Sequence, residues 1–196
     1  LLLFLIIILL IKINTVENFN QEACSDNIND IDYLKHMIPH HQVAVDISLV
    51  LEKKTKSPIM KKIIRELIWT QKYEINLMKQ VLKKKFANVA DNELVDNYIP
   101  SANDYIYPNK LEISDTYCDP LFFDPEDHMK HMDHMGELDE IMYIEHMIPH
   151  HIVAVDMSKK LLKNTKNDFM IYLAYRIIRN QTAETILLNG LLNKKN

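Results

Sequence analysis

The sequence is poor in glycine, with only two among its 196 residues. Sheet proteins need turn residues roughly every 8–12 positions, and glycine supplies many of them. The shortage therefore argues against an all-β fold and favours an all-α one. Arginine is also scarce, at three residues against twenty lysines, and the formal net charge is −4. This charge argues against a protein that binds the phosphate backbone of nucleic acids.

Recognisable catalytic signatures are missing as well. The chain has no GxSxG, HExxH, P-loop or dinucleotide-binding motif. These motifs mark nucleophilic hydrolases, zinc proteases, nucleotide hydrolases and dehydrogenases. We therefore expect a binding protein in preference to an enzyme, although a metal-dependent activity stays open.

Cysteine is limited to Cys24 and Cys118, and the only long apolar run is Leu1–Ile11. Eleven residues suit the apolar core of a signal peptide and are short for a membrane span of about 20 residues. A cleaved signal and a retained membrane anchor both stay open. Either predicts an exported protein, whether periplasmic, extracellular (secreted) or lumenal. In an oxidising compartment the two cysteines could form a disulfide, with two unpaired thiols as the alternative.

Histidine and methionine, in contrast, are plentiful and clustered. All nine His fall within residues 36–41, 128–134 and 146–151, and several of the ten Met accompany them. Imidazole and thioether donors together select soft or borderline ions, Cu(I) above all, with Cu(II) and Zn also suitable. Hard ions would need convergent carboxylates instead. The clusters therefore predict a metal site, with copper as the preferred ion.

The chain also contains an internal repeat. Residues 33–82 align with residues 143–192 at a constant offset of 110, without a gap. The first copy opens with HMIPHHQVAVDIS and the second with HMIPHHIVAVDMS. A duplication of this length predicts two equivalent structural units.

Each unit is expected to be a helical hairpin. The first covers residues 30–86, with helices over 30–54 and 58–85, the second of them starting at Pro58 after Ser57. The second unit covers 125–193, with helices over 125–163 and 167–192, and an irregular linker, 87–124, joins the units. The sequence thus predicts an all-α, ferritin-like four-helix bundle made of two duplicated hairpins.

A proline lies inside the first helix of each unit, at Pro39 and Pro149. An interior proline removes one helical hydrogen bond and usually kinks the helix. We expect a kinked helix, because the apolar and His positions keep helical spacing on both sides. The alternative is that each helix begins at its proline.

The spacing of His and Met in these helices predicts where they point. On a helical wheel of about 100° per residue, His36 and His40 share one stripe, and Met37 and His41 flank it. All four could converge on one point if the helix faces a partner. The same positions in the second copy are occupied by His146, Met147, His150 and His151.

The second helix of each hairpin carries polar residues on its apolar stripe. These residues are Gln71 and Glu74, repeated as Gln181 and Glu184. A carboxylate on a core-facing stripe is costly unless it is paired or bound to a metal. We infer that these side chains face the histidines, as ligands or as hydrogen-bond partners that orient the imidazoles.

A further His/Met run, HMKHMDHM, precedes the second copy and has no counterpart in the first. Its histidines recur every three residues, and each is followed by a methionine. Its donors join the predicted metal ligands: His128, Met129, His131, Met132, His134 and Met135.

HMIPHH followed by VAVDIS, with a Q-x-x-E about thirty residues later, resembles the family known as domain of unknown function 305. The resemblance covers residues 30–86 and 125–193, and implies a ferritin-like helical bundle, often exported and in some members associated with copper. The family commonly has a Met four residues after the Glu. Met78 keeps this pattern and Leu188 does not, so the second site differs from the first if that Met is a ligand.

The predicted function is therefore metal binding, with copper as Cu(I) or Cu(II), for sequestration or delivery outside the cytosol. Zinc and iron are weaker candidates. Two alternatives stay open: a di-iron or other metal-dependent redox bundle, and a structural bundle whose histidines respond to pH. The sequence names no protein partner, and it leaves open whether the hairpins share one site or build two.

Overall fold

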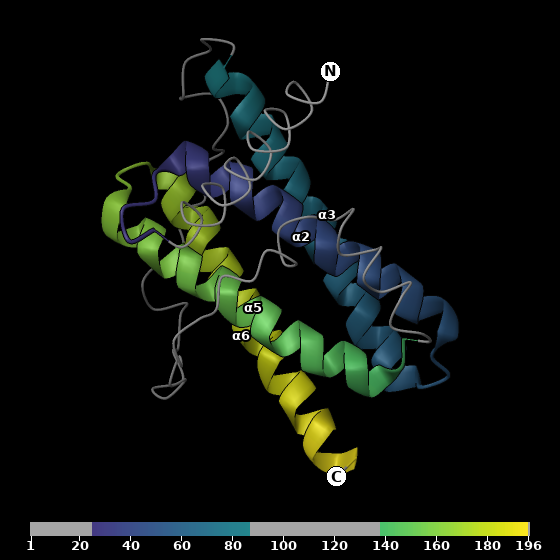
Figure 1. Cartoon of the computed structure of the whole chain (residues 1–196). Coiled ribbons are helices and arrows are strands. Elements are labelled where there is room, and N and C mark those ends of the chain that lie inside the picture. Colours follow the sequence, from purple (N-terminus) through teal and green to yellow (C-terminus); the bar gives the residue numbers. More distant parts are fainter. Residues whose placement is uncertain (1–24, 87–137, 196) are drawn as a thin grey trace, which may run out of the picture.

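The structure is a computed structural model that describes residues 25–86 and 138–195. This part of the chain is helical, and its helices pack as two hairpins, α2 against α3 and α5 against α6 (Figure 1). The predicted all-α architecture of two helical hairpins is confirmed. The four helices are α2 (Asp30–Lys54), α3 (Pro58–Phe86), α5 (Glu140–Asn164) and α6 (Asp168–Lys195).

Side-chain caps set the start of α2 and α3. Before α2, the Oδ1 atom of Asn29 accepts hydrogen bonds from the first-turn amides of Ile31 and Asp32, both at 3.0 Å. Before α3, the Oγ atom of Ser57 accepts one from the amide of Met60 at 3.3 Å. These groups satisfy amide donors that have no partner within the helix itself. Helix α3 starts at Pro58 as predicted, because a first-turn proline loses no helical hydrogen bond.

One predicted helix boundary is wrong. A single helix was expected from Pro125 to Lys163, but residues 138 and 139 are not helical and α5 begins at Glu140. The Asp139 carboxylate accepts a hydrogen bond from the amide of Met142 at 2.8 Å, so it caps a new helix at this point. A short acceptor side chain favours this capping conformation over a continuing helix.

Both interior prolines lie within continuous helices. Pro39 is inside α2 and Pro149 is inside α5. The alternative in which each helix starts at its proline is therefore wrong. Because the helices continue across these prolines, the histidines before and after each one belong to the same element.

The most extensive packing between the two hairpins is that of α2 with α5, which run antiparallel (Figure 1). At one end, Asn164 at the close of α5 donates hydrogen bonds to the carbonyls of Asp26 and Ile28, just before α2. At the other end, Thr55 after α2 is hydrogen-bonded to Glu140 at the start of α5. The two histidine-bearing helices are thus the inner pair of the molecule.

Two hydrophobic cores form around this pair, and their residues correspond at the 110-residue offset. Each core draws on all four helices. The first combines the start of α2, the end of α5, the first half of α6 and the second half of α3, and the second combines the start of α5, the end of α2, the first half of α3 and the second half of α6. Burial of such apolar surface is the main force that holds the hairpins together. The first core includes Tyr33, Met37, Met78, Met157, Met170 and Leu173; the second includes Tyr143, Met147, Leu188, Ile47, Met60 and Ile63.

Several predictions lie outside the described residues. They concern the apolar run 1–11, both cysteines, the linker 87–124 and the His/Met run. Within residues 25–86 and 138–195, no helix is both long and apolar enough to cross a membrane.

Candidate metal site

A layer of buried polar side chains lies between the two hydrophobic cores. Most of these residues lie where a helix passes from the segment in one core to the segment in the other, and His36 lies one turn before them, within the first-core segment of α2. Buried polar groups are costly unless they are hydrogen-bonded or bound to a ligand. Its members are at most 2% exposed, apart from the Glu184 side chain at 15%: His36, His40, His41, Gln71, Glu74, His150, His151, Gln181 and Glu184.

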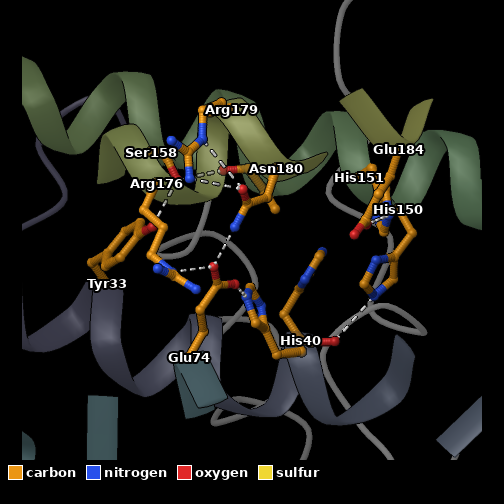
Figure 2. A network of polar contacts seen from close by, with 12 residues as sticks. Tyr33, His40, Glu74, His150, His151, Ser158, Arg176, Arg179, Asn180 and Glu184 are labelled. Atoms are coloured by element: carbon orange, nitrogen blue, oxygen red, sulfur yellow. Dashed lines mark hydrogen bonds and ion pairs between the residues drawn. The ribbon is translucent and has the colours of Figure 1, made fainter. Parts of the chain in front are cut away.

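The first half of the layer contains a buried His–Glu pair between α2 and α3. The Nε2 atom of His41 lies 2.9 Å from Oε2 of Glu74, and both side chains are fully buried. The other oxygen of Glu74 accepts hydrogen bonds from Arg176 Nε at 3.0 Å and Asn180 Nδ2 at 2.9 Å, both on α6 (Figure 2). Glu74 therefore faces the histidine helix, and its charge is balanced from the other hairpin.

The second half repeats the pair between α5 and α6. The Nε2 atom of His151 lies 2.7 Å from Oε2 of Glu184. The Glu184 side chain is 15% exposed, whereas that of Glu74 is fully buried. The two His–Glu pairs share their geometry but differ in their surroundings.

Two histidines meet at the centre, across the contact between α2 and α5. The ring centroids of His40 and His150 are 3.7 Å apart, and His150 Nε2 donates a hydrogen bond to the carbonyl of His40 at 3.1 Å (Figure 2). The His150 ring also lies 6.0 Å from those of His146 and His151, and the His40 ring lies 6.1 Å from that of His41. Histidines of both hairpins thus form one continuous group.

Burial keeps these central imidazoles neutral. It lowers the pKa of His40 and His150 well below the ordinary value, and the neighbouring imidazoles lower both further. Burial also lowers the pKa of His36 to about 4. Neutral imidazole is the form that binds metal ions, because its nitrogen lone pair is free to coordinate.

Several buried polar atoms that are able to bind a metal ion have no hydrogen-bond partner within the described residues. They are Nδ1 of His41, Nδ1 of His151 and both amide atoms of Gln71 and of Gln181. A buried polar atom without a partner costs about 1–3 kcal/mol, so such atoms are expected where a ligand supplies the missing contact. Metal-binding histidines commonly coordinate through one nitrogen and donate the other N–H to a carboxylate. His41 and His151 have this arrangement, which leaves Nδ1 as the coordinating atom.

The nitrogen and carboxylate donors do not form a complete coordination set by themselves. Over the described ranges, no group of three or more His, Cys, Asp or Glu side chains is arranged to hold a metal ion. Met37 and Met147 are fully buried beside the layer, in the first and the second core respectively. The sequence pattern predicts their thioethers as additional soft donors, and this stays a prediction.

Sequence reasoning missed the two partners of Glu74, Arg176 and Asn180. One feature of the sequence pointed to Arg176: the equivalent residue in the first copy of the repeat is Glu66, so the two copies differ in charge at this position. The contact itself joins residues 102 positions apart, on different hairpins. Helical periodicity within one hairpin carries no information about such a contact.

Solved structures share this architecture. CopM in its Cu(II)-bound form aligns with a TM-score of 0.62 and 25% identity, covering 86% of this chain and 98% of that one. Its Cu(I)-bound form aligns with a TM-score of 0.59 and 24% identity, over 87% and 96% of the two chains. A DUF305 fragment from Deinococcus radiodurans has a TM-score of 0.53 and 18% identity over 84% and 95% of the chains, a likeness of fold alone.

The sequence comparisons agree with the structural ones. Uncharacterized protein L153 of Acanthamoeba polyphaga mimivirus is 38% identical over 58 residues, which span 30% of this chain and 38% of that relative. The model of the domain of unknown function DUF305 matches residues 30–192. This match includes all four described helices nearly to their ends, and the chain therefore belongs to the DUF305 family.

Proposed function

We propose that this protein binds copper and holds it or passes it on outside the cytosol. The observation that carries the proposal is the buried polar layer. There, a carboxylate orients the imidazole of His41 and another that of His151, and both rings keep a buried Nδ1 atom without a hydrogen-bond partner in the described structure. This arrangement is expected of histidines that bind a metal ion through Nδ1 while Nε2 donates to a carboxylate.

The chemistry of the surrounding donors supports copper in particular. Imidazole and amide groups form the layer, and the thioethers of Met37 and Met147 are buried in the cores on either side of it. Soft thioethers favour Cu(I) over harder ions. CopM, which shares the fold, was solved with Cu(I) and with Cu(II). We propose the run His128–Met135 as an additional copper-binding segment, and the apolar start of the chain as its export signal or anchor.

A di-iron centre is a weaker proposal for the same layer. Such centres use several inward carboxylates from facing helices. In the described part of the layer the carboxylates are Glu74 and Glu184, and Glu74 is already bonded to Arg176. The supply of carboxylates is therefore small for two iron ions.

A pH-responsive bundle also fits less well. A switch near neutral pH needs histidines that gain a proton there. The pKa values of His40 and His150 lie well below that range because both rings are buried. The central histidines therefore stay neutral over the pH range in which such a switch would work.

The test is a copper titration of the metal-free protein. Cu(I), under reducing conditions, and Cu(II) are each titrated against a competing chelator, and bound metal is measured by elemental analysis. We expect the original chain to bind copper tightly. The double variant His41→Asn/His151→Asn is expected to bind fewer copper ions per chain. The matched control is Asp46→Asn/Asp156→Asn on the same helices, where Asp46 bonds to Gln42 and Asp156 to Lys160. Equal copper stoichiometry in both double variants would contradict the proposal.

A further inference from the structure

The outer face of α3 is strongly basic. This helix carries eight basic residues and two acidic ones, although the whole chain has a net charge of −4. Its exposed basic residues include Lys62, Arg65, Lys72, Lys79 and Lys83. At the 110-residue offset, the equivalent positions of α6 hold uncharged residues, namely Tyr172, Tyr175, Thr182, Asn189 and Asn193. The hairpin fold therefore does not require these charges.

Two aromatic side chains lie among the basic ones. Trp69 is 71% exposed and Tyr73 is 42% exposed, and their rings are stacked with centroids 6.1 Å apart. A surface groove of about 470 Å³ next to them is also lined by Arg65 and Lys72. Large exposed apolar side chains that cluster in this way indicate a surface that another group covers.

These residues share one side of the helix. At 100° per residue they fall within an arc of about 120°. We call this side the basic face of α3; it consists of Lys62, Arg65, Trp69, Lys72, Tyr73, Lys79 and Lys83.

The opposite charge is concentrated in the segment that follows α3. Residues 87–137 contain twelve Asp and Glu residues and two Lys, so this part of the chain has a net charge of −10. The segment is joined directly to the end of α3 at Phe86. Tethering gives it an effective concentration of the order of millimolar at the helix, so that individually weak ion pairs act together.

The two ends of this segment lie at opposite ends of α3. The segment begins after Phe86, at the carboxyl end of the helix, and leads into α5. The start of α5 is near the other end of α3, because Glu140 is hydrogen-bonded to Thr55 (Figure 1). Helix α3 has 29 residues and is therefore about 43 Å long. Residues 87–137 have to cover about this distance.

We infer that residues 87–137 dock on the basic face of α3. Their number permits several routes between the two ends of the helix, and the charge of the basic face selects this one. Within the described structure, Arg65 is paired with Glu52 at 2.7 Å and Lys62 with Glu66 at 3.9 Å. Over the same residues, Lys72, Lys79 and Lys83 have no carboxylate partner, so they are the cations left for the acidic segment.

The first test is zero-length crosslinking of the full, metal-free chain. A carbodiimide joins a lysine amine to a carboxylate that is in contact with it, and mass spectrometry of the monomer fraction identifies the joined residues. We expect Lys72, Lys79 and Lys83 to be joined to acidic residues of 87–137, and these products to become scarce in 1 M salt, where the Debye length is about 3 Å. The controls are three exposed lysines of the second hairpin, Lys163, Lys166 and Lys194, which are expected to give few such products.

Trp69 provides an independent readout, because it is the only tryptophan in the chain. Its exposure is measured by acrylamide quenching of its fluorescence. Between 0.01 M and 1 M salt the Debye length falls from about 30 Å to about 3 Å, and we expect the quenching constant to rise about twofold or more as the segment is released.

A pair of matched triple variants assigns this effect to the basic face. Lys72→Gln/Lys79→Gln/Lys83→Gln is expected to show the high quenching constant already at 0.01 M salt, because the cations that hold the segment are gone. Lys163→Gln/Lys166→Gln/Lys194→Gln is expected to behave as the original chain does. All six positions are exposed, so both variants are expected to keep the helical circular dichroism of the original chain.

Three outcomes would overturn the inference. The first is an absence of crosslinks from the basic face to residues 87–137 together with quenching that does not depend on salt. The second is crosslinks that occur only in a dimer fraction, which would make a second copy the occupant. The third is a Trp69 that is fully exposed at low salt and becomes shielded by phosphatidylglycerol vesicles, which would assign the face to an anionic membrane. None of these readouts involves copper, so the proposed function stands or fails separately.

Discussion

At the residue scale, Glu74 is a carboxylate with no exposed surface in the middle of the molecule. A buried charge costs several kcal/mol unless it is paired and hydrogen-bonded. Glu74 meets this condition through His41, Arg176 and Asn180, which together engage both of its oxygens. Arg176 is one of only three arginines in the chain, and it sets the charge of the first half of the layer.

Burial also decides the protonation of the histidines, which leads to a pH prediction for the metal-free protein. Burial lowers the folded-state pKa of His36 to about 4 and those of His40 and His150 well below the ordinary value. The unfolded chain therefore binds protons first as pH falls below about 6.5. We expect the free energy of unfolding to be highest above that pH and to fall as pH decreases toward 4.

This dependence is measured by urea denaturation at several pH values between 7.5 and 5, in the presence of a chelator. The window avoids most carboxylate titration, which occurs at lower pH. The groups nearest His40 and His150 are the other imidazoles, His41, His146 and His151, which also favour the neutral form. Replacing His36 with Gln is expected to reduce the slope. A stability that does not change over this range contradicts the prediction.

At the scale of the helices, two buried tyrosine–serine hydrogen bonds join α2 to α5. The hydroxyl of Tyr33 lies 2.7 Å from Oγ of Ser158, and the hydroxyl of Tyr143 lies 2.8 Å from Oγ of Ser48. Burial raises the pKa of both tyrosines, so their hydroxyls stay protonated and can hydrogen-bond at any physiological pH. The two contacts are at equivalent positions of the repeat, and both hold α2 against α5.

Removing each tyrosine hydroxyl is expected to have a different cost. Ser158 also donates a hydrogen bond to the carbonyl of Ala154 at 2.7 Å, so it keeps a partner in Tyr33→Phe. Among the described residues, Ser48 has Tyr143 as its hydrogen-bond partner, so Tyr143→Phe leaves the buried hydroxyl of Ser48 unsatisfied. We expect a loss of ~1 kcal/mol for Tyr33→Phe and about 1–3 kcal/mol for Tyr143→Phe. Denaturant unfolding of the metal-free variants measures both, and a larger loss in Tyr33→Phe would show that this explanation is wrong.

At the scale of the whole molecule, the polar layer is built from all four helices and is complete only when the hairpins are paired. Glu74 on α3 is bonded to α6, and His40 on α2 packs against His150 on α5. A metal ion bound in this layer would therefore bind the folded state and not the unfolded chain. Binding that is selective in this way stabilises the fold by mass action.

We expect copper to raise the melting temperature. At a free copper concentration about 100 times the dissociation constant, the gain is about 2.7 kcal/mol. For a chain of this size that corresponds to an increase of about 5–10 °C. Calorimetry or thermal circular dichroism measures the shift, which a chelator should reverse and Ca²⁺ should not produce, because Ca²⁺ requires oxygen ligands. An unchanged melting temperature at saturating copper would show that the ion binds outside the folded layer.

Much of the fold was determined by the sequence itself. The repeat, the helical spacing of apolar residues and the short capping side chains predict two helical hairpins, with α2 and α3 close to their observed bounds. The same spacing predicts that Glu74 faces the histidine helix, which it does through His41. These features depend on residues near one another in the chain, where periodicity and capping are informative. The start of α5 was predicted wrongly because the cap at Asp139 was not recognised.

Only the tertiary structure decided how the hairpins pair. Periodicity shows which face of a helix is buried, but it does not show which other helix that face meets. The contact of the His40 ring with the His150 ring and the bond from Arg176 to Glu74 both join residues more than 100 positions apart. The sequence therefore supplied the donor atoms of the proposed metal site twice. The antiparallel packing of α2 against α5 placed them in one buried layer, and the bond of Arg176 to Glu74 makes its two halves different in charge.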